Sequence, residues 1–208
     1  MEVQFYGANC VRISSKKANL VIDDNLVDLG QKSITKAGDI ALFTTTHSDP
    51  KADVKLVIDA PGEYEVSNVS IKGISARAHM DEAGKKSAII YRLVIDDIRV
   101  AVMGHIYPDL SEEQLEAIGT IDMIIIPVGG SGYTLDPVGA LKVIKKIEPK
   151  LIIPTHYSDK ALKYEVPQQP LDEALKALSM EPKEPLDKLK LKSVDIGELT
   201  QLVVLERQ

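Results

Sequence analysis

Cysteine is almost absent from this chain of 208 residues, which contains one, Cys10. A lone cysteine excludes an internal disulfide framework. Because Cys10 lies inside an apolar run that is typical of a β-strand, we expect it to be a small buried hydrophobic residue and not a reactive thiol.

Long apolar runs are also absent. No stretch approaches the roughly 18 consecutive apolar residues that a membrane-spanning helix needs. The first residues, Met1 to Gly7, form neither the positively charged segment nor the apolar segment of a secretory signal. We therefore expect a cytoplasmic protein that has no membrane partner.

An excess of basic residues is lacking too. Lys and Arg total 25 against 31 Asp and Glu, which gives a net charge of −6, and the basic residues are scattered along the chain. Because a nucleic-acid-binding surface needs clustered positive charge, nucleic acid is not an expected partner. With 44% apolar residues and no break in composition, residues 1–208 are expected to form one domain with a substantial core.

Histidine is scarce, and its four positions form a pattern. His47, His79, His105 and His156 each follow an apolar or β-prone run. In α/β sheets ligand sites gather beyond the carboxyl ends of the strands, and imidazole is the commonest metal ligand in proteins. Asp49 joins the group because side chains at i and i+2 of an extended segment point to the same side. These five residues are candidates for a single metal centre.

Hydrophobic periodicity and turn residues predict the elements that carry these positions. Strands are expected at residues 2–6, 10–14, 18–22, 39–44, 55–59, 69–78, 87–95, 98–103, 121–126, 151–155, 188–192 and 200–206. Helices are expected at residues 111–118, 137–147 and 170–179. Ser111 and Asp136 are the expected first residues of two helices, and Val138 is placed on the apolar face of the second.

Several segments resemble the metallo-β-lactamase-fold hydrolases, and most of all a small prokaryotic branch related to the ascorbate-6-phosphate lactonases. The resemblance runs nearly end to end and rests on residues 5–13, 20–23, 45–50, 61–66, 126–130 and 153–157. It implies an α/β fold, the four-layer αββα sandwich, with a metal site at one edge between the two sheets. It also implies that Asp23 supports the metal-binding loop through hydrogen bonds without contacting the metal.

The chain departs from the signature loop of that family. The loop reads His-x-His-x-Asp-His, whereas Thr45 and Pro50 stand here at the first and last histidine positions. His105 takes the place of an aspartate whose carboxylate bridges two metals in the family. A neutral imidazole has one lone pair and cannot bridge in that way, so the resemblance implies a degenerate metal-binding motif.

The ligands that remain favour one metal ion over two. By the resemblance, His47 and His79 belong to the first site and Asp49 and His156 to the second, with His105 between them. A catalytic zinc takes three protein ligands and a water, so every three-ligand set needs His105. Zinc is the expected ion, with manganese, iron or nickel as alternatives. The other interpretation is an emptied site without metal, whose histidines hydrogen-bond to one another and to Asp49.

The chemistry expected of such a site is hydrolysis of a small-molecule ester, lactone or phosphoester, because zinc lowers the pKa of its water to near 7. Asp49 is the candidate general base, and Tyr157 or Tyr133 is the candidate oxyanion donor. Gly130 and Tyr133 belong to a flexible rim for substrate, which lacks the Lys-Ser/Thr pair of a nucleotide-binding loop. The alternative is a catalytically degenerate relative that acts as a ligand-binding or scaffold protein.

Overall fold

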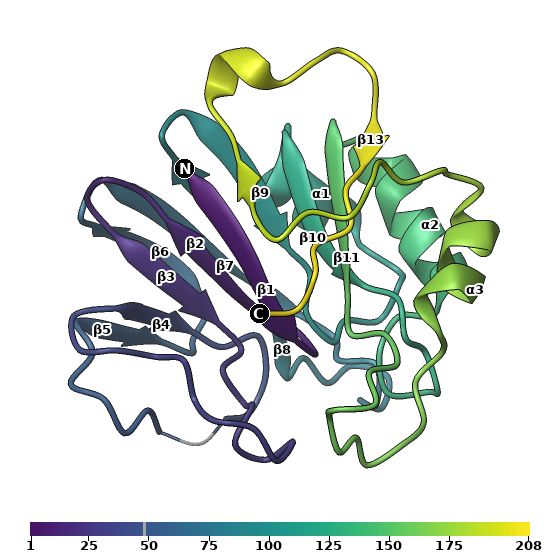
Figure 1. Cartoon of the computed structure of the whole chain (residues 1–208), viewed down its shortest axis with the longest axis horizontal. Helices are drawn as coiled ribbons and strands as arrows, with labels where there is room; N and C mark the ends of the chain where they lie inside the picture. Colours follow the sequence, from purple (N-terminus) through teal and green to yellow (C-terminus); the bar gives the residue numbers. More distant parts are fainter. Residues whose placement is uncertain (48) are drawn as a thin grey trace.

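The computed structural model describes residues 1–47 and 49–208, and within them it contains two β-sheets and three α-helices (Figure 1). The first sheet has the strand order β12-β1-β2-β3-β4-β5. Its strands are β1 (Glu2–Gly7), β2 (Cys10–Ser14), β3 (Asn19–Ile22), β4 (Ile40–Leu42), β5 (Leu56–Ile58) and β12 (Leu189–Lys190). Strands β3, β4 and β5 are parallel, so their carboxyl ends share one edge.

The second sheet has the strand order β13-β11-β10-β9-β8-β7-β6. Its strands are β6 (Gly62–Val66), β7 (Val69–Ala76), β8 (Ala88–Ile95), β9 (Ile98–Val102), β10 (Met123–Pro127), β11 (Leu151–Thr155) and β13 (Gln201–Leu202). Strands β6 to β9 pair antiparallel, whereas β9, β10, β11 and β13 pair parallel. The carboxyl ends of β9, β10 and β11 therefore lie at the same edge.

The largest apolar core fills the space between the two sheets. On β8, Ile89 and Leu93 point into this core, whereas Ala88 and Ile90 point to the opposite face, which the helices cover. Successive side chains of a strand point to opposite faces. Burial on both faces explains why the strands of this sheet are continuous apolar runs in the sequence.

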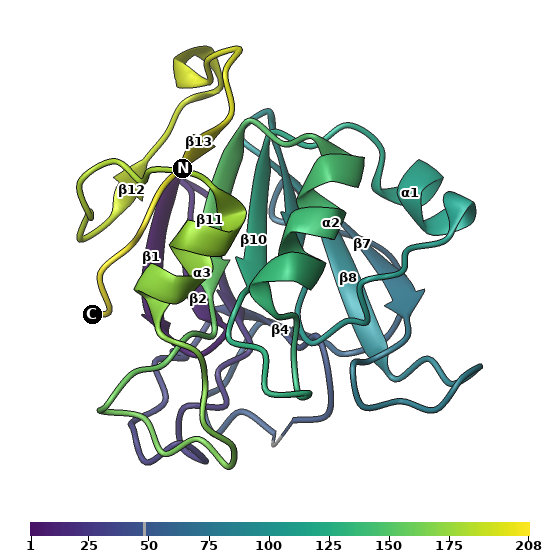
Figure 2. The ribbon, with the colours of Figure 1, turned by 90° about the vertical axis from the view of Figure 1, so that its right-hand side faces the viewer.

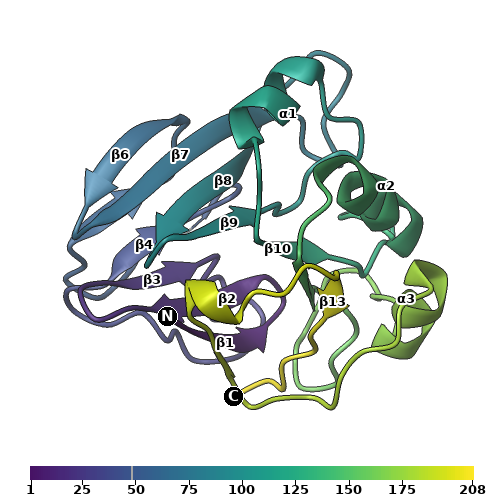
Figure 3. The ribbon, with the colours of Figure 1, turned by 90° about the horizontal axis from the view of Figure 1, so that it is seen from above.

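Three helices, α1 (Glu112–Ile118), α2 (Pro137–Ile147) and α3 (Leu171–Leu178), cover the outer face of the seven-stranded sheet (Figures 2 and 3). A short 3₁₀ turn, η1 (Ser193–Asp195), lies near the C-terminus. Ser111 forms a capping box with Gln114, and the Asp136 side chain accepts a hydrogen bond from the Gly139 N–H. Both predicted helix starts are therefore confirmed. Among the described residues, no helix is long and apolar enough to cross a membrane.

The outer face of the six-stranded sheet is covered by the segment 23–38. Leu26 of this segment packs with Cys10 and Val21 of the sheet, and Cys10 is fully buried, as predicted. Within this described segment the backbone forms turns and bends but no helix. The predicted α/β fold with two packed sheets is confirmed, and an irregular segment forms its fourth layer.

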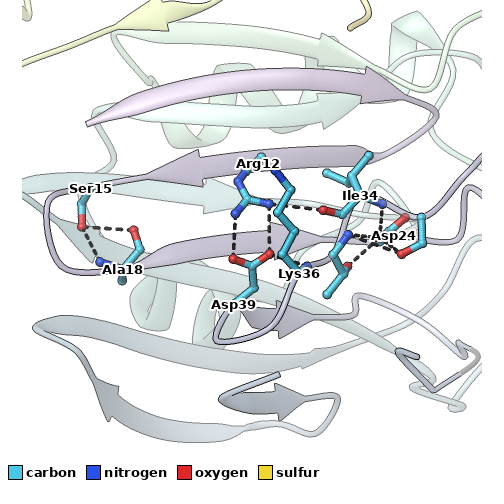
Figure 4. Close-up of polar contacts among 9 residues, drawn as sticks. Arg12, Ser15, Ala18, Asp24, Ile34, Lys36 and Asp39 are labelled. Atoms are coloured by element: carbon cyan, nitrogen blue, oxygen red, sulfur yellow. Dashed lines mark hydrogen bonds and ion pairs between the residues drawn. The ribbon is translucent and has the colours of Figure 1, made fainter. Parts of the chain in front are cut away.

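Polar contacts fix the segment 23–38 to the sheet (Figure 4). The guanidinium of Arg12 on β2 donates to both carboxylate oxygens of Asp39, at 3.0 and 2.7 Å. The Asp24 carboxylate accepts from the N–H groups of Ile34, at 2.9 Å, and Thr35, at 2.8 Å. A bidentate, buried ion pair is a geometrically specific contact. Arg12 also donates to the Ile34 carbonyl at 3.4 Å. The sheet therefore holds the segment at Ile34 and directly after its end, and Asp24 joins the two halves of the segment.

The two sheets are also joined by a polar contact across the core. The hydroxyl oxygen of Tyr91, on β8, lies 2.8 Å from the carbonyl oxygen of Phe43 and 2.9 Å from that of Ile58. Phe43 and Ile58 belong to the ends of β4 and β5 on the opposite sheet. Tyr91 therefore fixes the position at which the chain leaves β4.

Several details differ from the sequence prediction, and one of them is strand β6 (Gly62–Val66), which was not predicted. Val138 is 70% exposed, so its assignment to the apolar face of α2 is wrong; it lies about 140° around the helix from Val143, which is buried. The closing strands β12 and β13 are two residues long, shorter than predicted. Beyond β13 the chain leaves the seven-stranded sheet, and Arg207 forms a bridge with Phe5 of the other sheet, which interrupts regular pairing.

Candidate functional site

A cavity of about 260 Å³ lies at the edge where the two sheets meet. The six-stranded sheet and its loops contribute Asn9, Asp23, Asn25, Thr45 and Thr46 to its wall, and the loops after β9, β10 and β11 contribute His105, Tyr133 and His156. The loop from Lys163 to Gln168 forms the remaining wall. The cavity thus occupies the edge at which α/β sheets usually bind ligands.

His105 and His156 meet in this cavity. Their ring centroids are 4.6 Å apart, edge to face, and the ring of Tyr133 lies 4.8 Å from His105. Burial lowers the pKa of His105 well below its usual range, and the nearby His156 and His79 lower it further. Burial also lowers the pKa of His156 to about 4. Both imidazoles are therefore neutral near pH 7, which is the state that binds metal ions.

The backbone and ring of His156 are both fixed. Its φ of 52° lies in the left-handed region that non-glycine residues rarely adopt, and its N–H donates to the carbonyl of Ala8 at 2.8 Å. Its Nδ1 lies 3.2 Å from Oε1 of Gln168, an acceptor, so Nδ1 carries the proton and Nε2 keeps its lone pair. A Cβ at Gly129 would come within 1.9 Å of the His156 carbonyl oxygen, so only glycine fits there. A strained left-handed backbone at a non-glycine residue, as at His156, is typical of functional positions.

Asp23 supports the loop that follows β4. Its carboxylate accepts hydrogen bonds from the Thr44 N–H at 2.7 Å and from the Thr44 hydroxyl at 2.6 Å. Burial raises the pKa of Asp23 to about 6, although the hydrogen bonds from Thr44 act in the opposite direction. These contacts give Asp23 the supporting role that the family resemblance implied.

His79 lies next to His105 but outside the cavity wall. Its backbone N–H donates to the His105 carbonyl at 2.8 Å, and its ring is tilted against Tyr107 at 5.8 Å. Its Nδ1 is buried and has no hydrogen-bond partner within residues 1–47 and 49–208. His79 is therefore close enough to lower the pKa of His105. Its own Nδ1 has no hydrogen-bond partner in the described chain.

His47 and Asp49 lie in a second depression, which adjoins the cavity and shares Thr45 with its wall. The His47 ring stacks on Phe43 at a centroid distance of 3.7 Å, and its Nε2 lies 3.1 Å from the Asp59 carboxylate. Asp49, which is exposed, and Asp59 line this depression together with His47. The expected convergence of all five residues is therefore not observed. In the described part of the chain, no three His, Cys, Asp or Glu side chains are grouped so as to hold a metal ion.

The physical reason lies in the signature loop, of which Ser48 is outside the described residues. Thr45 and Pro50 stand where the resembled signature has histidines, so this loop carries two imidazoles fewer than that signature. His47 instead has an aromatic ring and a carboxylate as neighbours outside the cavity.

Two other residues that were predicted to contact substrate do not line the cavity. The Tyr157 hydroxyl donates to the Leu205 carbonyl at 3.4 Å and its ring packs against Phe5 at 5.6 Å, so the geometry does not support an oxyanion role for it. The Gly130 N–H donates to the Leu135 carbonyl at 3.0 Å and is therefore not available to substrate. Tyr133, in contrast, lies on the cavity wall and remains 38% exposed.

Asn9 and Gln168 are site residues that the sequence analysis missed. Both are buried and both line the cavity. Asn9 follows Gly7 and Ala8 in the turn between β1 and β2, where asparagine is an ordinary turn residue. Its partner Thr155 is 146 positions away, so no local pattern could reveal the contact.

The site offers possible metal ligands, although no three of them are grouped around one point in the described chain. His105 and His156 are neutral imidazoles on one cavity, and the Nδ1 atoms of His105 and His79 are buried without a hydrogen-bond partner in the described chain. An unsatisfied buried nitrogen costs free energy, which coordination to a metal ion would recover. The donors that a second ion would need, His47 and Asp49, lie in the other depression.

Known proteins resemble this chain in sequence and in structure. A profile of the beta-lactamase superfamily domain matches residues 2–156. A UPF0173 metal-dependent hydrolase from Thermococcus onnurineus is 31% identical over 101 residues, which cover 47% of this chain and 44% of that protein. Another from Pyrococcus horikoshii is 27% identical over 143 residues, which cover 65% of this chain and 62% of that protein. The matches thus span about half to two thirds of these relatives.

Solved structures match over the whole chain. A Thermotoga maritima crystal structure, classed as a Zn-dependent hydrolase of the metallo-beta-lactamase superfamily, has a TM-score of 0.77 and 26% identity and covers 100% of this chain and 99% of that one. A structure from Parabacteroides distasonis has a TM-score of 0.66 and 18% identity, covers 99% of this chain and 93% of that one, and shows the same fold.

Proposed function

Because the chain belongs to the beta-lactamase superfamily, we propose that it is a metal-dependent hydrolase of a small molecule, with one divalent ion bound by His105, His156 and His79. The observation that carries the proposal is the meeting of two neutral, buried imidazoles, those of His105 and His156, on the wall of one cavity. The names of the similar proteins from Thermococcus and Pyrococcus, both metal-dependent hydrolases, support the same reaction class.

A different observation supports each of the three histidines as a proposed ligand. His156 offers Nε2, because its protonated Nδ1 donates a hydrogen bond to Oε1 of Gln168. His105 shares the cavity with it, and His79 is bonded to His105 through its backbone and has an unsatisfied ring nitrogen. Zinc is the proposed ion, since imidazole suits it, and manganese, iron and nickel are the alternatives.

A bound zinc ion supplies Lewis-acid polarisation and lowers the pKa of water. The residues of this chain would supply the rest. Tyr133 keeps its phenolic proton near pH 7, because burial raises its pKa, and it can donate to an oxygen that gains negative charge. Asp23 lines the cavity with a pKa of about 6 and takes the role of proton acceptor that was expected of Asp49.

Metal content tests this proposal. The purified chain is incubated with zinc, desalted and analysed for elements, and we expect close to one ion per chain. His105→Ala should lose the ion, whereas the matched variant His47→Ala should retain it, since His47 lies in the other depression. Two tightly held ions in the parent, or loss of the ion in His47→Ala and not in His105→Ala, would refute the proposed centre.

The second candidate function is that of a ligand-binding protein without catalysis. It is favoured by the absence of a preformed three-ligand group among the described residues. Such a protein would bind its ligand equally well in the presence of a chelator and would hydrolyse no ester after zinc loading. A zinc-dependent rate that disappears in His105→Ala would exclude it.

A further inference from the structure

The cavity contains a hydrogen-bond donor that the proposed metal centre does not use. Asn9 is 6% exposed and lines the cavity. Its Oδ1 accepts from the Thr155 hydroxyl at 2.9 Å, which fixes the orientation of the amide. Its Nδ2 is buried and has no hydrogen-bond partner in the described part of the chain. The amino group is therefore the side of Asn9 that is left for a ligand.

An unused buried donor of this kind needs an explanation. Leaving a buried polar group unsatisfied costs free energy, and native proteins contain few such groups. A ligand oxygen in the cavity would remove the cost. Asn25, on the same wall, also has a buried side-chain atom without a partner in the described chain, Oδ1.

The charges around the cavity limit what the ligand can be. Asp23 is buried in the wall, and Asp28 and Glu165 are exposed at the rim. Among the described residues that line the cavity, Lys163 is the one lysine or arginine. Three carboxylates against one ammonium group leave no excess positive charge to attract an anion, even after a divalent ion is bound.

We propose that the cavity binds an uncharged acyl compound, a small ester or lactone, whose carbonyl oxygen accepts a hydrogen bond from Asn9 Nδ2. This inference rests on the proposed hydrolase function and narrows its substrate from ester, lactone or phosphoester to the acyl class. The volume, about 260 Å³, lies below the range of about 300–1,000 Å³ of drug-sized sites, so the substrate is small. In the reaction the oxygen of water bonds to the acyl carbon, the bond from that carbon to the alkoxy oxygen breaks, and the alkoxy oxygen takes a proton.

The substrate class is tested with two probes that share a leaving group. The zinc-loaded full chain is assayed with p-nitrophenyl acetate, which is neutral, and with bis(p-nitrophenyl) phosphate, which is an anion. Each kcat/KM is divided by the rate constant of the uncatalysed reaction. We expect the enhancement for the ester to exceed that for the diester about 10-fold or more. A larger enhancement for the diester would overturn the acyl assignment and leave the hydrolase proposal intact.

Asn9 is tested by substitution. Asn9→Ala removes the donor, and Asn9→Asp keeps the acceptor for Thr155 while replacing the donor with a second acceptor. Both should lower kcat/KM for the ester about 10-fold or more, with the zinc content unchanged. The control is Asn68→Asp, in the exposed turn between β6 and β7, which should match the parent. An unchanged kcat/KM in folded Asn9→Ala would overturn the role of Asn9.

A binding measurement decides the same point without catalysis. Acetamide is a neutral carbonyl compound that also carries N–H donors, and it resists hydrolysis. In a ¹H–¹⁵N spectrum the side-chain amide signal of Asn9, assigned by its loss in Asn9→Ala, should move on addition of acetamide and stay in place with inorganic phosphate. A parent that hydrolyses neither probe would refute the proposed function, and this titration would still test Asn9. An Asn9 signal that does not shift on addition of acetamide, or that shifts with phosphate alone, would refute the inference.

Discussion

Thr44 lies directly against Gly104. A Cβ built on Gly104 would come within 2.3 Å of the Thr44 hydroxyl oxygen, and the φ of Gly104 is +57°. Thr44 is the residue that Asp23 holds through two hydrogen bonds, and Gly104 immediately precedes His105. The contact therefore sets the distance between the loop after β4 and the histidine after β9.

Gly104→Ala should destabilise the fold because it adds a methyl group to this contact and strains a left-handed backbone. We expect a loss of about 2 to 4 kcal/mol in the free energy of unfolding. The matched control is Gly84→Ala, where φ is +91° and no atom lies within 4 Å of the new Cβ, so backbone strain alone should cost about 1 to 2 kcal/mol. Urea titrations of both variants measure the difference, and equal losses would contradict the steric argument.

Asp23→Asn should alter the dependence of stability on pH. Burial raises the pKa of Asp23 from 3.8 to about 6, so the folded state binds this proton more tightly than the unfolded state does. The resulting stabilisation is present below about pH 4 and is lost as the pH rises through about 6. Asparagine cannot ionise, so the variant should lack this loss, which amounts to about 3 kcal/mol. Unfolding free energies of parent and variant between pH 4 and 7 should therefore not run parallel.

His156→Asn should have the opposite effect in the metal-free protein. Burial lowers the pKa of His156 from 6.5 to about 4, so on acidification the unfolded chain takes up this proton at a higher pH than the folded protein does. The stability that the neutral ring contributes is present above about pH 6.5 and is lost as the pH falls toward 4, by about 3 kcal/mol. Asparagine tolerates the left-handed backbone at this position. With a chelator present, the variant should lose less stability than the parent on acidification, and an equal loss would refute a buried neutral His156.

Thr45→His should strengthen metal binding. Thr45 lines the same cavity as His105 and His156, so an imidazole there adds a ligand to the proposed centre. We expect the dissociation constant for zinc, measured by competition with a chelator, to fall about tenfold or more. Pro50→His restores the other histidine of the family signature, but Pro50 does not line the cavity, so this variant should bind zinc as the parent does. A gain in Pro50→His and none in Thr45→His would contradict the proposed position of the centre.

Most of the fold could be predicted from the sequence, because periodicity is a local property. The helix predicted at residues 137–147 is α2 with the same bounds, and the strand predicted at 98–103 is β9 to within one residue. Val138 was misplaced since an apolar residue in a first helical turn can point to solvent, and its neighbours do not reveal this. The fourth layer formed by the segment 23–38 depends on Asp39, whose partner Arg12 is 27 positions away, and on Asp24, whose partner Ile34 lies within the segment, 10 positions away.

The site was predictable only where a strand fixes the direction of a residue. His105 and His156 stand directly after buried parallel strands, and their meeting follows from the order of those strands. His47 stands in a loop whose direction depends on Asp59 and Phe43, and no sequence pattern gives that packing. Asn9 was missed because its pairing with Thr155 joins the first strand pair to β11.

Tyr91 links the core between the two sheets to the shape of the cavity. Its hydroxyl fixes the carbonyl of Phe43, and Thr44, which Asp23 and Gly104 contact, is the next residue. The width of the cavity therefore depends on how closely the sheets pack around this one phenol, as well as on the residues that line the wall. A buried substitution next to Tyr91 is therefore expected to change the shape of the cavity while every wall residue stays the same.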